Sequence, residues 1–189
     1  VMGFNIVRIS LKKSAGSGEV VEKTNTSSMK NDQYVIGNNP TQFQQDEFKK
    51  LTEALKGDDP LAISEAVVRN FIADYFTWTN KDGNYEVGGL QYIYGPMFTS
   101  FQEQSRWEFY KDLDLYISQY GRENLLEVSD ITITSSAVAG NFELYSGEEF
   151  ASFYIETTWN YKPSPKIDVD SFQKTGYFTV INNNGRYEI

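Results

Sequence analysis

The apolar pattern of this chain changes its period once, near Gly121, and that change limits the folds open to it. Before Gly121, apolar residues recur every three or four positions, as in amphipathic helices. After Gly121 they alternate at every second position, as in strands. Helices followed by strands predict an α+β domain, in which N-terminal helices pack on one face of a curved antiparallel sheet.

Two helices are predicted between Thr41 and Asn80. The first spans 41–57, because Phe48 and Leu51 lie at helical spacing and Gly57 is a common stop signal. The second begins at Pro60, since the preceding Asp59 can cap the free amides and Pro occupies the first turn at no hydrogen-bond cost. We expect this second helix to run to about Thr79.

Residues 81–84 form a turn signal, and the glycines and proline of 88–98 predict irregular chain with a short helical piece. A third helix is predicted within 104–121. Its apolar positions recur at steps of three or four, at Trp107, Tyr110, Leu113, Ile117 and Tyr120. Gly121 is its expected end.

Strand patterns then follow at 126–136, 138–146, 148–162 and 171–183. In the third of these, one face carries Ala151, Phe153, Ile155, Thr157, Trp159 and Tyr161. The chain closes with a predicted hairpin, because Asn184-Gly185 suits a tight turn with positive φ and 186–189 reads as a short last strand.

Residues 1–40 are predicted to form a flexible juxtamembrane stalk or tail, and residues 41–189 a single domain. The apolar start, VMGFNIV, is too short to span a bilayer and is followed by Arg8, Lys12 and Lys13. It fits the edge of a removed membrane anchor, but an engineered end or a first β-strand fits equally well. The Ser, Gly, Thr, Asn and Lys of 12–33 favour a flexible stalk.

The chain contains neither Cys nor His. This excludes disulfides and Cys-ligated zinc, and it removes the usual general base near neutral pH. Residues 1–40 hold five Lys/Arg against three Asp/Glu, whereas 41–189 hold twelve against twenty-three. Because so acidic a body repels phosphate, direct nucleic-acid binding is not expected.

The order of elements resembles the nuclear-transport-factor-two-like cone fold. FTVINNNGRYEI is similar to the terminal hairpin of many members of that fold. AVVRNFIADYFTW, followed by a polar turn, is similar to the first helix in the soluble domains of VirB-type and Gram-positive conjugative transfer proteins of type IV secretion. The resemblance covers about 46–189. It implies a strongly curved, cone-like sheet and a bitopic protein whose domain lies outside the membrane.

The helix predicted from Pro60 has a stripe of small and polar residues, namely Ala62, Glu65, Ala66, Arg69, Asn70, Ala73, Asp74 and Thr77. Phe71, Tyr75 and Trp78 lie on the other side, and we expect them to plug the open end of the sheet. Asp74 is therefore expected to face solvent or to form a local hydrogen bond. Glu65 and Arg69 are expected to form an i,i+4 ion pair.

Two sets of residues are candidates for chemistry. Glu156, flanked by Tyr154 and Thr158, is the best match to the acid of a cone-fold isomerase, although a solvated sheet face is the favoured interpretation. The possible cation ligands are Asp112 and Asp114, then Asp168 and Asp170. Neither set has the loop glycine and spacing of a calcium hand, and Asp112 and Asp114 are expected inside a helix where they point apart. No metal site or cofactor is expected.

The expected function is a non-enzymatic scaffold or assembly component of a bacterial conjugative (type IV) secretion complex, on the cell-wall side of the cell membrane. Its expected partners are other proteins of that complex, and further copies of itself. The alternative is a small-molecule-binding or isomerase-like cone protein, with a pocket inside the sheet lined by Tyr154, Glu156 and Trp159.

Overall fold

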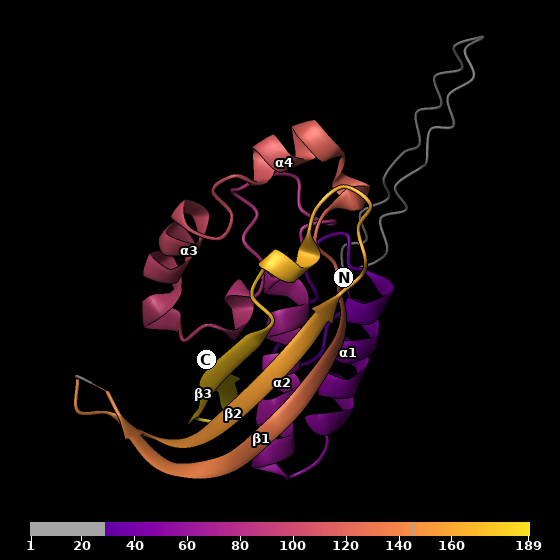
Figure 1. Ribbon diagram of the computed structural model, residues 1–189. Helices are drawn as coiled ribbons and strands as arrows, with labels where there is room; N and C mark the ends of the chain where they lie inside the picture. Colours follow the sequence, from indigo (N-terminus) through magenta and orange to yellow (C-terminus); the bar gives the residue numbers. More distant parts are fainter. Residues whose placement is uncertain (1–28, 145) are drawn as a thin grey trace, which may run out of the picture.

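The computed structural model describes residues 29–144 and 146–189. Its helices are α1 (Gln42–Ala54), α2 (Pro60–Tyr75), α3 (Phe98–Trp107) and α4 (Leu113–Tyr120), with 3-10 turns at Leu90–Tyr92, Gly95–Met97, Arg122–Asn124 and Val169–Ser171. The strands β1 (Val128–Glu143), β2 (Glu149–Tyr161), β3 (Thr175–Asn183) and β4 (Arg186–Glu188) form one antiparallel sheet in that order. Helices α1 and α2 lie against one face of the sheet (Figure 1). The α+β class is confirmed.

The start of α2 was predicted correctly, but its end was not. The Asp59 carboxylate accepts the backbone N–H groups of Leu61 and Ala62, and Pro60 occupies the first turn. The helix stops at Tyr75 rather than near Thr79. Here the Trp78 N–H donates to the carbonyl of Leu126, just before β1, at 2.7 Å. This tertiary hydrogen bond takes the place of the one that the Trp78 N–H would form in a continuing helix. The end of α2 could therefore not be predicted from the spacing of neighbouring residues.

The single helix predicted within 104–121 is wrong, because the chain forms α3 and α4 with a break between them. Tyr110 lies in the break, where its N–H bonds to Ser105 O and its hydroxyl donates to the carbonyl of Tyr75. Tyr110 is fully buried, whereas Trp107 is 80% exposed. The two rings therefore do not share the helix face that their spacing suggested.

The strands predicted at 126–136 and 138–146 are one strand, β1. Its register against β2 shifts between Ile133 and Ser135 and again between Val138 and Gly140. An extra residue at each shift interrupts the alternation while the pairing continues, so the pattern gave the appearance of a break. The resulting β1–β2 ribbon bends away from the body of the domain (Figure 1).

Strand β2 alternates as predicted over most of its length. Phe153, Ile155, Thr157, Trp159 and Tyr161 are buried, while Ala151 at the outer end of the same face is exposed. The terminal hairpin is also confirmed: Asn184 and Gly185 have φ of 52° and 93°, the conformation that a tight two-residue turn needs.

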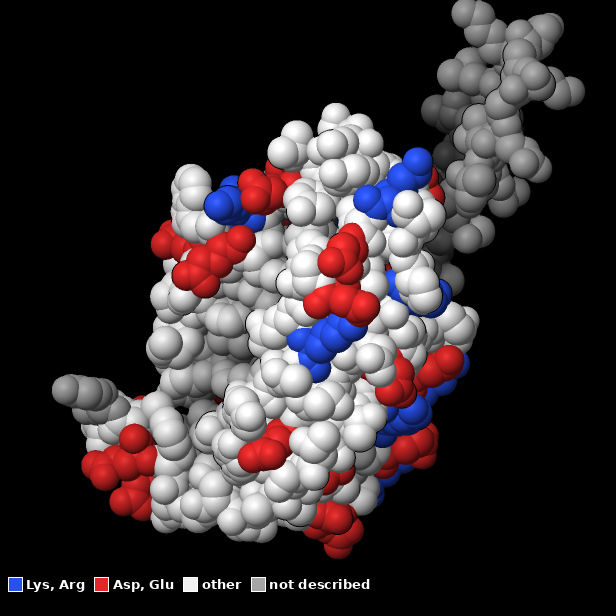
Figure 2. Space-filling view, in the orientation of Figure 1, with Lys and Arg blue, Asp and Glu red and all other residues white. Residues whose placement is uncertain are grey.

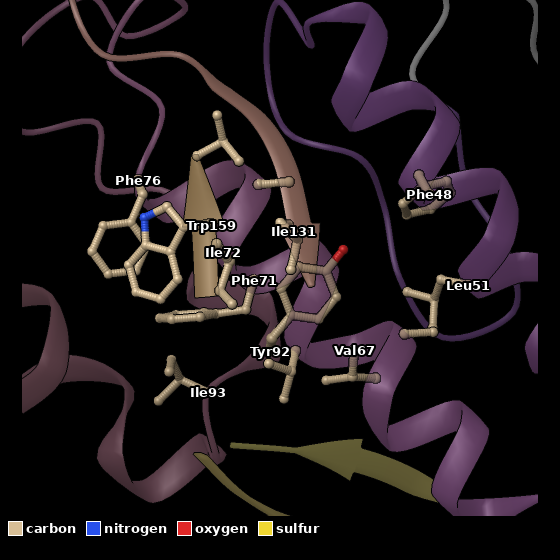
Figure 3. Packing of buried hydrophobic residues seen from close by; sticks show 14 of the residues in the cluster. Phe48, Leu51, Val67, Phe71, Ile72, Phe76, Tyr92, Ile93, Ile131 and Trp159 are labelled. Atoms are coloured by element: carbon tan, nitrogen blue, oxygen red, sulfur yellow. The ribbon is translucent and has the colours of Figure 1, made fainter. Parts of the chain in front are cut away.

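The core between α2 and the sheet is rich in aromatic rings. The Trp159 indole lies against the Phe76 ring, with their centroids 4.4 Å apart (Figure 3). Phe71 stacks on Tyr75 at 5.1 Å and meets Phe178 of β3 at 5.7 Å. The apolar side of α2 therefore packs against the sheet.

Residues 29–40, which the sequence assigned to the stalk, pack on the domain. Tyr34 is only 1% exposed, and its hydroxyl donates to the Tyr187 carbonyl of β4 at 2.7 Å. The Arg186 guanidinium lies 4.6 Å from the centre of the Tyr34 ring. The packed part of the chain thus begins before Thr41, held by a residue close to the other end of the domain.

In residues 29–144 and 146–189, no helix combines the length and apolar character required to cross a bilayer. The expected edge of a membrane anchor falls within residues 1–28 and lies outside the described residues.

Candidate functional site

Asp74, expected to face solvent or bond locally, lies instead in a polar contact that joins several elements. One carboxylate oxygen is 2.5 Å from the Lys81 ammonium, and the other accepts the Gly89 N–H at 2.7 Å. The Gln44 amide of α1 also reaches Asp74. Both charged side chains are largely buried, Lys81 more so than Asp74. The carboxylate therefore fixes the 81–89 loop to α2.

Arg69 does not form the predicted i,i+4 pair with Glu65. Its guanidinium binds the carboxylate of Glu47 on α1 through two nitrogens, at 2.6 and 3.1 Å, and donates to the Ile131 carbonyl at 2.8 Å. Glu65 instead accepts the hydroxyl of Ser136 on β1 at 2.6 Å. The polar stripe of α2 is thus an interface with α1 and β1, a fact that a single-helix pattern cannot reveal.

The space inside this polar interface is too small for a ligand. Ile36, Gly37, Gln44, Asn70, Ala73, Asp74, Gln91 and Tyr92 enclose about 10 Å³. That volume suits no more than one water molecule. We conclude that the polar groups between α1 and α2 hold the helices together.

The loop that approaches Asp74 gives a direct test of this packing. A Cβ added at Gly88 would lie 2.4 Å from the backbone carbonyl oxygen of Asp74, which cannot rotate away. We expect Gly88→Ala to lower the free energy of unfolding by about 1–3 kcal/mol, the usual cost of overpacking. Gly95→Ala is the matched control, because a Cβ there meets nothing within 4 Å. Urea denaturation of both variants measures the difference, and equal stabilities would contradict the packing.

The three residues proposed to line a pocket do not come together. Trp159 is buried on the helix-covered face, where its indole N–H donates to the Tyr161 hydroxyl at 3.1 Å. Tyr154 and Glu156 lie on the opposite face of β2, and the Tyr154 ring stacks on Tyr177, which is 71% exposed. Loss of hydration, followed by the hydrogen bond with the Glu156 carboxylate, raises the pKa of Tyr154. The phenol is therefore neutral near pH 7, as in an ordinary surface pair.

The aspartates considered as cation ligands lie at helix ends or take part in contacts within the protein. Asp112 precedes the first turn of α4 rather than lying inside a helix. The Asp168 carboxylate accepts the Asp170 N–H, and Asp170 pairs with Lys174. Among the described residues, no group of three or more acidic side chains is placed to hold a metal ion.

A polar hollow of about 410 Å³ lies where the start of α1 meets the turn after α4. Its lining residues are Asn39, Thr41, Gln42, Thr79, Asn80, Arg122, Glu123 and Glu127. Arg122 in this hollow pairs with Asp82, and Glu127 pairs with Lys162 at 2.6 Å. The hollow is open to solvent, and two of its three charged residues, Arg122 and Glu127, are engaged in ion pairs.

Large apolar side chains are exposed on the outside of the domain. Trp107 ends α3 with 80% of its surface exposed, and Tyr177 and Val138 are similarly exposed on the sheet. Met97, Phe98, Leu115 and Phe142 are also exposed. Of these residues, Trp and Tyr are the types that contribute most to protein–protein binding when a partner covers them. The spacing of Trp107 with Tyr110 and Leu113 predicts a shared apolar helix face, so the exposure of Trp107 has no signal in the sequence.

Comparisons with protein-family models, curated proteins and solved structures found no match to this chain.

Proposed function

We propose that this domain is a non-enzymatic assembly component, which acts by binding other proteins in a bacterial conjugative (type IV) secretion complex. The observation that carries the proposal is the exposure of large apolar side chains, above all Trp107 at 80%. Trp is among the residues that contribute most to protein–protein binding when a partner covers it. The resemblance of AVVRNFIADYFTW to the first helix of conjugation proteins, with that of the terminal hairpin to the cone fold, supplies the setting.

The environment of the candidate acids supports a role without catalysis. The Asp74 carboxylate is engaged by Lys81 and Gly89. Glu156 lies on the outer face of the sheet, away from Trp159. No observation separately favours the small-molecule-binding or isomerase alternative, whose pocket would need these residues together.

The proposal includes three finer features that the resemblance implies. The sheet would have cone-like curvature, which the register shifts in β1 support because bulges bend a strand. A single N-terminal membrane helix would place the domain on the cell-wall side. Other secretion proteins, and further copies of this chain, would be its partners.

Deletion of the gene in a donor strain tests this function. We expect conjugative DNA transfer to fall to background and to recover when the wild-type gene is supplied. A Glu156→Gln gene should restore transfer equally well, because the proposed role needs no acid. Undiminished transfer after deletion would overturn the proposal, and failure of Glu156→Gln to restore transfer, with normal protein levels, would favour an enzyme.

A further inference from the structure

Among residues 29–144 and 146–189, β1 pairs with β2 alone, so the outer side of β1 is an edge of the sheet that these residues form. The direction of its backbone groups follows from the register. The backbone N–H of Trp159 in β2 donates to the carbonyl of Lys174, which lies on the β3 side. Every second residue of β2 counted from Trp159, including Phe153, therefore points its backbone N–H and C=O groups toward β3. Their partners on β1, which include Ile131 and Val138, must point their N–H and C=O groups away from the sheet.

The half of this edge near the helices is already occupied. The Thr77 hydroxyl oxygen accepts the N–H of Val128 at 3.1 Å, and the Arg69 guanidinium donates to the carbonyl of Ile131 at 2.8 Å. Both side chains come from α2 or from the residues just after it. They prevent another strand from pairing with this half.

The other half of the edge is open. Every residue from Ala137 to Glu143 is exposed, and Val138 is 69% exposed. Within the described part of the chain, no side chain is hydrogen-bonded to the outward backbone groups of Val138 or Asn141. Between Asp130 and Glu143 the strand has no charged residue and no proline, the residues that usually protect an edge. Free donors and acceptors on an extended strand are a template for another strand.

Negative charge marks both ends of the open edge. Glu143, Glu148 and Glu149 are exposed where the ribbon ends, and acidic side chains gather there in the lower left of Figure 2. At the other end, Glu65 accepts the Ser136 hydroxyl at 2.6 Å. A second copy pairing antiparallel would bring its Glu143 beside this Glu65, and like charges oppose that arrangement. A segment that carries Lys or Arg would be attracted to both ends.

We propose that the β1 edge from Ser136 to Glu143 binds an extended, lysine- or arginine-bearing segment of a partner protein, which adds to the sheet as a further strand. This inference rests on the proposed assembly function and identifies the class of partner. Backbone pairing along the edge supplies affinity, and the carboxylates at its two ends select a basic segment over an acidic one.

The experiment uses a short fluorescent peptide in which lysine alternates with valine, with binding measured by anisotropy. We expect saturable binding that weakens as salt is raised. Val138→Pro removes an outward N–H but no bond to β2, so the fold should persist while affinity falls about tenfold or more. Val138→Thr is the matched control, because it keeps the outward N–H and should bind like wild type.

Two further peptides keep the test decisive even if Val138→Pro does not fold. A version with glutamate in place of lysine should bind much more weakly, and so should a version N-methylated at alternate backbone positions. Equal binding by either would overturn the inference. A wild-type dimer that Val138→Pro converts to monomer would overturn it too, in favour of a second copy at the edge.

DNA transfer by the donor strain distinguishes failure of the proposed β1 edge from failure of the proposed assembly function. We expect a folded Val138→Pro protein to reduce DNA transfer and Val138→Thr to leave it normal. Normal transfer with Val138→Pro, where gene deletion abolishes transfer, would remove the edge inference and leave the assembly function intact. No effect of deletion would remove the assembly function itself.

Discussion

Replacing Arg69 with methionine is expected to destabilise the domain by about 3–5 kcal/mol, the usual cost of breaking a buried ion pair. Arg69 is the guanidinium that binds the Glu47 carboxylate, and Glu47 is only 1% exposed. Without Arg69, a buried carboxylate loses its main partner and the Ile131 carbonyl loses a donor. Urea denaturation of the purified domain measures the change.

Lys50 provides the control for this substitution. Lys50 also pairs with Glu47, at 2.7 Å, but its side chain is 62% exposed. Lys50→Met should therefore cost no more than about 1 kcal/mol. Similar losses in the two variants would mean that burial of the Arg69 contact is not what stabilises the helices.

The same pair gives the domain a defined dependence on pH. Burial alone would raise the pKa of Glu47, but hydrogen bonds from Arg69 and Lys50 outweigh burial and hold it below its ordinary 4.5. A lowered folded pKa means that the pair stabilises the protein above pH 4.5, and that this contribution is lost as the pH falls through the folded value. In Arg69→Met, the guanidinium no longer opposes the effect of burial, so the pKa of Glu47 in the folded protein should be higher than in wild type. Protonating Glu47 then costs less, and acid should remove less stability from this variant than from wild type. Unfolding curves between pH 7 and pH 3 show the difference.

Replacing Trp159 with alanine is the second large change. The indole is 1% exposed, packs on Phe76 and donates to the Tyr161 hydroxyl. Removing it should leave a cavity under the sheet and cost about 3–5 kcal/mol. Circular dichroism during urea titration is the suitable measurement.

Trp107→Ala is the matched control for Trp159→Ala, since the same atoms are removed from a side chain that is 80% exposed. We expect its stability to stay within about 0.5 kcal/mol of wild type. A large loss at Trp107 would show that this ring supports the fold, and it would remove the observation behind the proposed binding role.

Local signals in the sequence were sufficient to predict the features that depend on neighbouring residues. Asp59-Pro60 predicted the start of α2, and Asn184-Gly185 predicted the last hairpin, because each works through bonds within a few residues. The period change predicted the α+β class for a similar reason. Each of these features is determined by the chain within one element.

The errors arose where distant parts of the chain meet. The end of α2 is set by a bond from Trp78 to Leu126, and the break before α4 by the burial of Tyr110. The polar side of α2 looked like a solvated face because its partner, Glu47 of α1, cannot be recognised from spacing within α2. Cone-like curvature remains a proposal, since the observed sheet is open.

The candidate binding edge could be predicted only in part from the sequence. The strand pattern indicated that 126–146 is extended, but not that it forms one edge strand. Which half of that edge is free depends on Arg69 and Thr77, whose contacts with β1 arise only from the packing of α2. Exposure of an edge is a property of the assembled sheet and has no local signature.

The contact between Tyr34 and Tyr187 has a consequence for the order of events during translation. The two residues are 153 positions apart, so the acceptor for the Tyr34 hydroxyl is synthesised long after α1 and α2. Residues 29–40 can contact α1 and the 86–91 loop early, through Asn31 with Thr52 and Val35 with Gln91, but the Tyr34 hydroxyl must wait for β4. A ribosome that stalls ahead of Arg186 would leave the buried Tyr34 ring without the Arg186 guanidinium and its hydroxyl without an acceptor, a state that quality-control factors could detect.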